Sequence, residues 1–171
     1  MDINEVLTDA FGRVDHNVRA AVSGLDASGL NYRPDADANS IGWLVWHLTR
    51  VQDDHVAHLA DRGQDYVAGG WAAGFGFGVD DGDIGFGHTP DQVAAVQFDD
   101  SEDLLAYFHA VQAHSLEYVS SVTPAELDRI VDERWEPPVS AGVRLVSVID
   151  DSIQHSGQAA YVRGLWERIA R

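Results

Sequence analysis

The segment Ser40–Val56, SIGWLVWHLTRVQDDHV, decides the fold. Its apolar residues recur at spacings of three and four, which is the pattern of an amphipathic helix with one buried face. Either Asn39 or Ser40 can cap the first turn, and Gly63 lies just beyond the last expected turn. We therefore predict a helix over residues 39–61.

Three further segments show the same helical periodicity, namely residues 2–25, 101–122 and 143–169. A short helix is expected over residues 89–96, where a threonine and a proline open the segment, and a helical turn over 123–131. Trp135–Ser140 reads as a proline-bearing connector. Four long helices without a convincing alternating strand predict one all-α domain over residues 1–171, a four-helix bundle.

The connection between the second and third long helices, residues 64–87, is rich in glycine and carries aromatic residues between the glycines. We expect no helix to persist through it. Loops this long are uncommon in compact domains and are often functional, so the segment is either a lid or pocket wall or a plain crossover. Its acidic part, VDDGDIGFG, lacks the spacing of a calcium-binding EF-hand loop.

The charge of the chain excludes several classes of partner. There are 28 acidic residues against 11 basic ones, all arginine, which gives a net charge of −17. Such a charge repels nucleic acids and anionic membrane surfaces. Without a signal peptide or an apolar run of roughly 20 residues, a cytoplasmic location is expected. The chain contains no cysteine, so any reactive thiol must come from another molecule.

Three side chains on apolar helix faces have the chemistry of metal ligands. Asp151 and His155 lie one turn apart on the last helix, and His47 lies on the apolar face of the second. A buried aspartate is costly unless a partner or a metal compensates it. If the helices are neighbours, two imidazole nitrogens and one carboxylate suit zinc and leave a coordination position open. Taken singly, a core histidine is more often structural, and the Asp–His pair could be a surface ion pair.

Two other histidines have weaker signals. His55, eight residues after His47, could approach the same bundle face as a pocket residue. His88 precedes a short helix whose N-terminus could favour an anion, although an ordinary loop histidine is the favoured interpretation.

The segments SIGWLVWHLTRVQDDHV and DDSIQHSGQAAYVRG resemble the two signature segments of the DinB/YfiT-like metalloproteins, and GFGHTPDQVAAV resembles their actinobacterial branch. These proteins are four-helix bundles with one histidine ligand from the second helix and two ligands four residues apart on the last. By this resemblance His47 and His155 match the first and last ligands. The middle ligand is usually histidine, whereas Asp151 is similar to the carboxylate of the mycothiol-dependent maleylpyruvate isomerases. The resemblance also implies a homodimer.

What the resemblance implies about function is a thiol S-transferase. A divalent metal, zinc or nickel, would activate the thiol of mycothiol for attack on an electrophile. Arg50 and Arg163 would bind polar groups of the thiol, unless they are surface ion-pair residues. Trp43, Trp46 and Trp71 would wall the electrophile pocket, unless they belong to the core.

Two other functions remain open from the residues alone. One is a metal-dependent hydrolase in which Asp54 or His55 acts as the base. The other is a non-catalytic stress protein that binds a metal or a small ligand. Thiol dependence separates the first from an S-transferase, because a hydrolase would turn over without a thiol.

Overall fold

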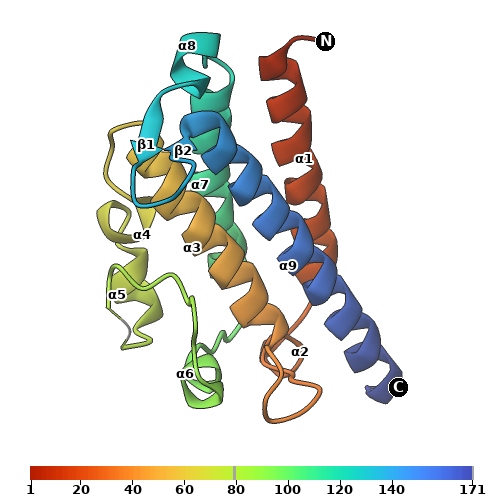
Figure 1. Ribbon diagram of the computed structural model, residues 1–171. Coiled ribbons are helices and arrows are strands. Elements are labelled where there is room, and N and C mark those ends of the chain that lie inside the picture. Colours follow the sequence, from red (N-terminus) through yellow and green to blue (C-terminus); the bar gives the residue numbers. More distant parts are fainter. Residues whose placement is uncertain (79, 171) are drawn as a thin grey trace.

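Four long helices pack side by side and carry the hydrophobic core in the computed structural model, which describes residues 1–78 and 80–170 (Figure 1). They are α1 (Ile3–Val22), α3 (Ile41–Leu59), α7 (Glu102–Val119) and α9 (Ala141–Ile169). Helices α1 and α3 each pack against both α7 and α9, so the four helices form a closed ring around the core. The predicted all-α four-helix bundle is confirmed.

Side-chain caps fix where the long helices begin. The Ser40 hydroxyl accepts a hydrogen bond from the amide of Trp43 at 3.1 Å, so Ser40 and not Asn39 is the N-cap of α3. Asp2 and Ser140 cap α1 and α9 in the same way. The predicted ends of the four helices lie within three residues of the observed ones.

Helix α3 is buried on nearly all sides. Of its 19 residues, 16 are buried, and these include the polar residues His47, Arg50 and Asp53. Its inner faces meet α7 and α9, while the segment that follows α3 packs against its outer side, where Trp46 contacts Tyr66 and Phe77. Because buried polar side chains require partners, the polar residues of α3 point to sites of specific interaction.

The glycine-rich connection is more ordered than expected. It contains α4 (Asp65–Ala68) and α5 (Trp71–Phe75), and α6 (Pro90–Ala95) follows it, while α2 (Ala27–Leu30) lies between α1 and α3. As expected, no helix runs through residues 64–87, but these two short helices form within the segment. Helix α5 lies between Gly70 and Gly76, which both adopt left-handed backbone angles, so the glycines limit helix length rather than prevent helix formation.

A small antiparallel sheet was also not predicted. After α8 (Pro124–Leu127), strand β1 (Ile130–Asp132) pairs with β2 (Val139–Ser140), directly before α9. The helical turn expected as far as Val131 therefore ends at Leu127. Strands of three and two residues are too short to show an alternating pattern in the sequence.

Among the helices of the described residues, none is long and apolar enough to cross a membrane.

Candidate metal centre

The side chains of His47, Asp151 and His155 meet at the contact between α3 and α9. His47 Nε2 lies 4.0 Å from Asp151 Oδ1, and His155 Nε2 lies 3.4 Å from the same oxygen. The two imidazole rings meet edge to face, with centroids 4.7 Å apart. One donor atom from each residue lies within 4.8 Å of the other two, so the structure brings the three predicted ligands together.

Hydrogen bonds at the far side of each ring select the nitrogen that faces this point. The carbonyl oxygen of Ile84 lies against His47 Nδ1, and because a carbonyl only accepts, Nδ1 carries the proton and Nε2 keeps its lone pair. His155 Nδ1 lies 2.9 Å from the amide oxygen of Gln158, which has the same effect. Metal-binding histidines in proteins are held by such outer hydrogen bonds.

The surroundings of His47 and of the Asp151 carboxylate suit a metal ion, whereas those of His155 favour its protonated form. Burial lowers the pKa of His47 and so favours the neutral imidazole that binds metals, whereas the hydrogen bond to Asp151 raises the pKa of His155. The second carboxylate oxygen of Asp151 is buried and has no hydrogen-bond partner among residues 1–78 and 80–170. An unpaired buried carboxylate oxygen is costly, and a cation would compensate it.

The residues present fit a divalent metal. Zinc bonds of roughly 2.1 Å in a tetrahedral arrangement place neighbouring donor atoms about 3.4 Å apart. The observed separations of 3.4 and 4.0 Å approach that value, and small side-chain rotations would close the difference. Three protein ligands leave a fourth position for water or substrate.

Arg50 is engaged away from the metal ligands. Its side chain is fully buried, and its guanidinium donates hydrogen bonds to the carbonyls of Asp81 and Asp83 and to the side chain of Gln64. These partners all belong to the glycine-rich connection. The surroundings of Arg50 therefore give no support to the predicted contact with a thiol cofactor.

Arg163 also has partners within the chain. It donates to Glu167 on α9 and to the carbonyls of Ala20 and Ser23 at the end of α1. It is eight residues, or about 12 Å along α9, beyond His155. Its predicted role in thiol binding stays a prediction without structural support.

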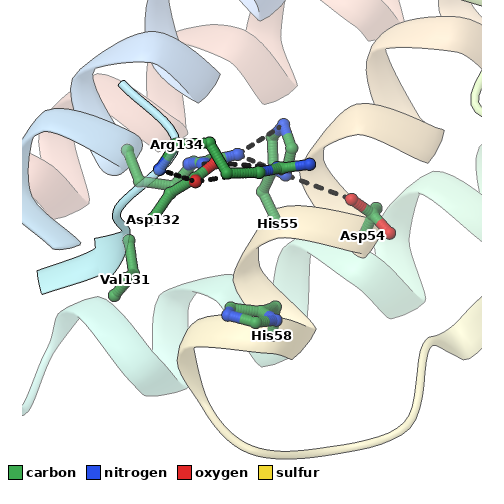
Figure 2. A pocket seen from close by; sticks show the side chains of 7 residues that line it. Asp54, His55, His58, Val131, Asp132 and Arg134 are labelled. Carbon is green, nitrogen blue, oxygen red and sulfur yellow. Dashed lines mark hydrogen bonds and ion pairs between the residues drawn. The ribbon is translucent and has the colours of Figure 1, made fainter. Parts of the chain in front are cut away.

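Asp54 and His55 lie in a separate pocket, a cavity of about 250 Å³ (Figure 2). His55 Nδ1 lies 3.1 Å from the Asp54 carboxylate, and the guanidinium of Arg144 lies 3.2 Å from the same nitrogen. Arg144 also pairs with Asp132 of β1. Since His55 is about 12 Å along α3 from the metal ligand on that helix, its pocket is distinct from the metal centre.

The residues that hold the ring of His47 were not found from the sequence. Besides the Ile84 carbonyl, Trp43 stacks on the ring with centroids 4.7 Å apart. The indole of Trp43 in turn donates to Nδ1 of His88, which is buried. The available signal was a glycine at position 85 three residues before the histidine at position 88. The backbone carbonyl at position 84 could not be identified from the sequence, because every residue has one.

Comparison with known proteins agrees with this geometry. The model of the DinB superfamily matches residues 10–159, a range that includes all three candidate ligands. The crystal structure of a conserved protein from Enterococcus faecalis is similar, with 28% identity, a TM-score of 0.89 and coverage of 95% of this chain and 96% of that one. None of the curated proteins matches the sequence. Because the family match covers well over half of its length, the chain belongs to the DinB superfamily.

Proposed function

We propose that this protein is a divalent-metal-dependent thiol S-transferase in which His47, Asp151 and His155 hold the metal and mycothiol supplies the attacking sulfur. The observation that carries the proposal is a cluster of three candidate metal ligands in a chain that has no cysteine. Three ligands would leave one coordination position open. A divalent metal in such a site holds an incoming thiol as its thiolate, which is a nucleophile at neutral pH. The thiol must come from another molecule, because the chain contains no cysteine.

The charge of the ligand set supports an anionic sulfur as the fourth partner. Two neutral imidazoles and the single carboxylate of Asp151 supply one negative charge against the two positive charges of a divalent ion. In a site where the His47 side chain is only 7% exposed, an uncompensated charge is costly. A thiolate would complete the neutralisation. Zinc suits this mixed nitrogen and oxygen set, and nickel is also compatible with it.

An apolar groove beside the ligands offers a place for the electrophile. It has a volume of about 470 Å³ and lies between α3 and α9. Leu44, one turn before His47, and Val162 contribute its apolar wall, and the lining includes Gln158, which is hydrogen-bonded to His155. Binding sites with mostly apolar walls and few polar groups suit apolar ligands. We therefore propose a largely apolar electrophile.

Elemental analysis followed by a conjugation assay tests the proposal. The metal-loaded protein should form the S-conjugate of mycothiol and monobromobimane faster than the two compounds react alone, and removal of the metal should return the rate to that uncatalysed value. His155→Ala should bind metal more than about 100-fold more weakly and lose the metal-dependent reaction. Metal-dependent turnover of a test ester at an unchanged rate without thiol would instead indicate a hydrolase, and full metal loading without any turnover would indicate a binding protein.

We propose further that the protein acts on small molecules as a homodimer and does not bind nucleic acid. The net charge of −17 supports the absence of a nucleic-acid partner. Light scattering of the purified protein tests the dimer, and a chain mass of 18.7 kDa at all concentrations would contradict it.

A further inference from the structure

The segment Asp81–His88 lies directly against the ring of His47, on the edge that faces away from the other metal ligands. The Ile84 carbonyl accepts the hydrogen bond of Nδ1. At Gly85, which has a φ of 87°, an added Cβ would lie 2.9 Å from His47 Nδ1 and 3.0 Å from Trp46. Only glycine permits both this backbone angle and this close approach.

Arg50 holds the beginning of the segment by hydrogen bonds to two of its backbone carbonyls. Its Nε donates to the Asp83 carbonyl and its Nη2 to the Asp81 carbonyl, each at 3.0 Å. The same guanidinium pairs with the buried carboxylate of Asp53 at 3.4 Å. The fully buried guanidinium of Arg50 therefore donates hydrogen bonds to the backbone of the loop, and the carboxylate of Asp53 on the same helix compensates its charge.

The side chains of Asp83 and His88 hold the rest of the segment by hydrogen bonds to Gly85, to each other and to Trp43. One carboxylate oxygen of Asp83 accepts from the amide of Gly85 at 2.7 Å, and the other lies 2.8 Å from His88 Nε2. His88 Nδ1 accepts from the indole of Trp43 at 3.1 Å. The carbonyl that orients the metal-binding ring is thus fixed by contacts on both sides.

We infer that the segment Asp81–His88 is a clamp that sets the metal affinity of the site, and that Arg50 is a positioning residue which acts through Asp83 and the Ile84 carbonyl on His47. Removal of such an outer partner of a metal ligand typically costs roughly 10- to 100-fold in metal affinity. The inference rests on metal binding by the three ligands, which the proposed function shares, but not on any thiol chemistry.

Two glycines of the same segment provide a matched test. Gly85 and Gly87 have φ values of 87° and 75°, so alanine at either position carries a similar backbone cost. A Cβ at Gly85 would contact His47, whereas at Gly87 no atom of the described residues other than Gly87 and its two chain neighbours lies within 4 Å of it. We expect Gly85→Ala to weaken zinc binding roughly 10- to 100-fold and Gly87→Ala to change it less than about threefold.

The measurement is zinc affinity by competition with a chromophoric chelator, together with the unfolding transition of the metal-free proteins. Equal zinc affinities of the two alanine variants would overturn the clamp and leave the S-transferase proposal intact. A clear difference between them without any S-conjugate formation would retain the clamp and overturn the S-transferase. A wild-type protein that binds no zinc, nickel, iron or manganese would overturn both.

Arg50→Lys keeps the charge but cannot donate to two loop carbonyls in the same geometry, so we expect about a tenfold weaker zinc affinity. If Arg50 acts through His47, then Arg50→Lys and Gly85→Ala disturb the same contact and the double variant should show less than the product of the two effects. Independent effects would overturn the positioning role. Should the Arg50 variant not fold, Asp83→Asn, at a side chain that is 24% exposed, tests the clamp through the contacts of the Asp83 carboxylate with Gly85 and His88 and should weaken affinity several-fold.

Discussion

The two histidines of the metal centre occupy opposite kinds of surroundings. His47 on α3 is 7% exposed, stacks on Trp43 and is held by a backbone carbonyl from a distant loop. His155 on α9 is 20% exposed and is held by Gln158, three residues further along the same helix. The α3 half is therefore built by tertiary packing, while the α9 half depends on local helix geometry.

The two halves of the site therefore differ in what they contribute: the α3 half fixes the orientation of an imidazole ring, and the α9 half borders a groove. The buried half fixes where a metal binds, because its ring orientation is set by contacts that persist only in the folded chain. The more exposed half borders the apolar groove, since Gln158 and Tyr161 contribute to its lining. In the proposed S-transferase, the electrophile would approach from the α9 side. Substitutions on the two helices should then have different consequences for stability and for binding.

The largest effect is expected from the ligands themselves. His47→Ala and His155→Ala should each weaken metal binding by more than about 100-fold, which exceeds the loss expected for outer partners. The metal-free proteins should differ, because His47→Ala leaves a cavity and an unpaired Ile84 carbonyl and should cost about 2 kcal/mol of unfolding free energy. His155→Ala should cost less than about 1 kcal/mol. Elemental analysis and urea unfolding measure both quantities, and equal destabilisation would contradict the comparison.

A substitution of Asp151, in the more exposed half on α9, can alter the charge of the site without a change to the backbone. Asp151→Asn should lower zinc affinity by at least about tenfold, because the amide cannot supply the negative charge and loses the charge-assisted contact with His155. Asp151→His should restore binding, since histidine is the usual residue at this position in the resembling family. Chelator competition on both variants checks this, and a histidine variant weaker than the asparagine one would show that the carboxylate itself is required.

Metal addition should stabilise the two halves unequally. A ligand present at 1,000 times its dissociation constant adds about 4 kcal/mol to the unfolding free energy. Because the buried half is already held by the loop, we expect the gain in hydrogen-exchange protection to be larger in α9 around residues 150–158 than in α3 around 44–51. Mass-spectrometric exchange with and without zinc measures it. A larger gain in α3 would mean that the loop does not hold His47 before the metal binds.

The sequence predicted the three residues that meet at the candidate metal centre but not the segment that holds the ring of His47, and the reason is physical. Asp151 and His155 are one helical turn apart on an apolar stripe, and His47 lies on a second such stripe, so helix geometry and burial suffice to select them. The Ile84 carbonyl, in contrast, belongs to the backbone, and any residue at position 84 would present one. Its position depends on how a glycine-rich connection folds, which residue spacing does not encode.

Arg50 illustrates the same limit. It lies one turn after His47 on nearly the same face of α3, and it was predicted to bind the thiol or to form a surface ion pair. The segment after α3 covers that face, so the guanidinium is buried against loop carbonyls. The helices of the bundle and their ends could be predicted from local periodicity. The contacts of the segment that covers α3 could be identified only from the tertiary structure.

The smallest effect on metal binding is expected from a substitution of His55. This variant tests how far along α3 residues influence the metal centre. Its ring lies between Asp54 and Arg144 in the pocket of Figure 2, about 12 Å along the helix from His47. His55→Ala should leave metal stoichiometry at the wild-type value and change zinc affinity less than about twofold, because outer-partner effects on a metal require contact with a ligand. Elemental analysis and chelator competition measure both. If His55→Ala instead abolished a metal-dependent, thiol-independent activity while metal binding persisted, the two pockets would act on one substrate that spans the contact between α3 and α9, and the hydrolase alternative would replace the S-transferase.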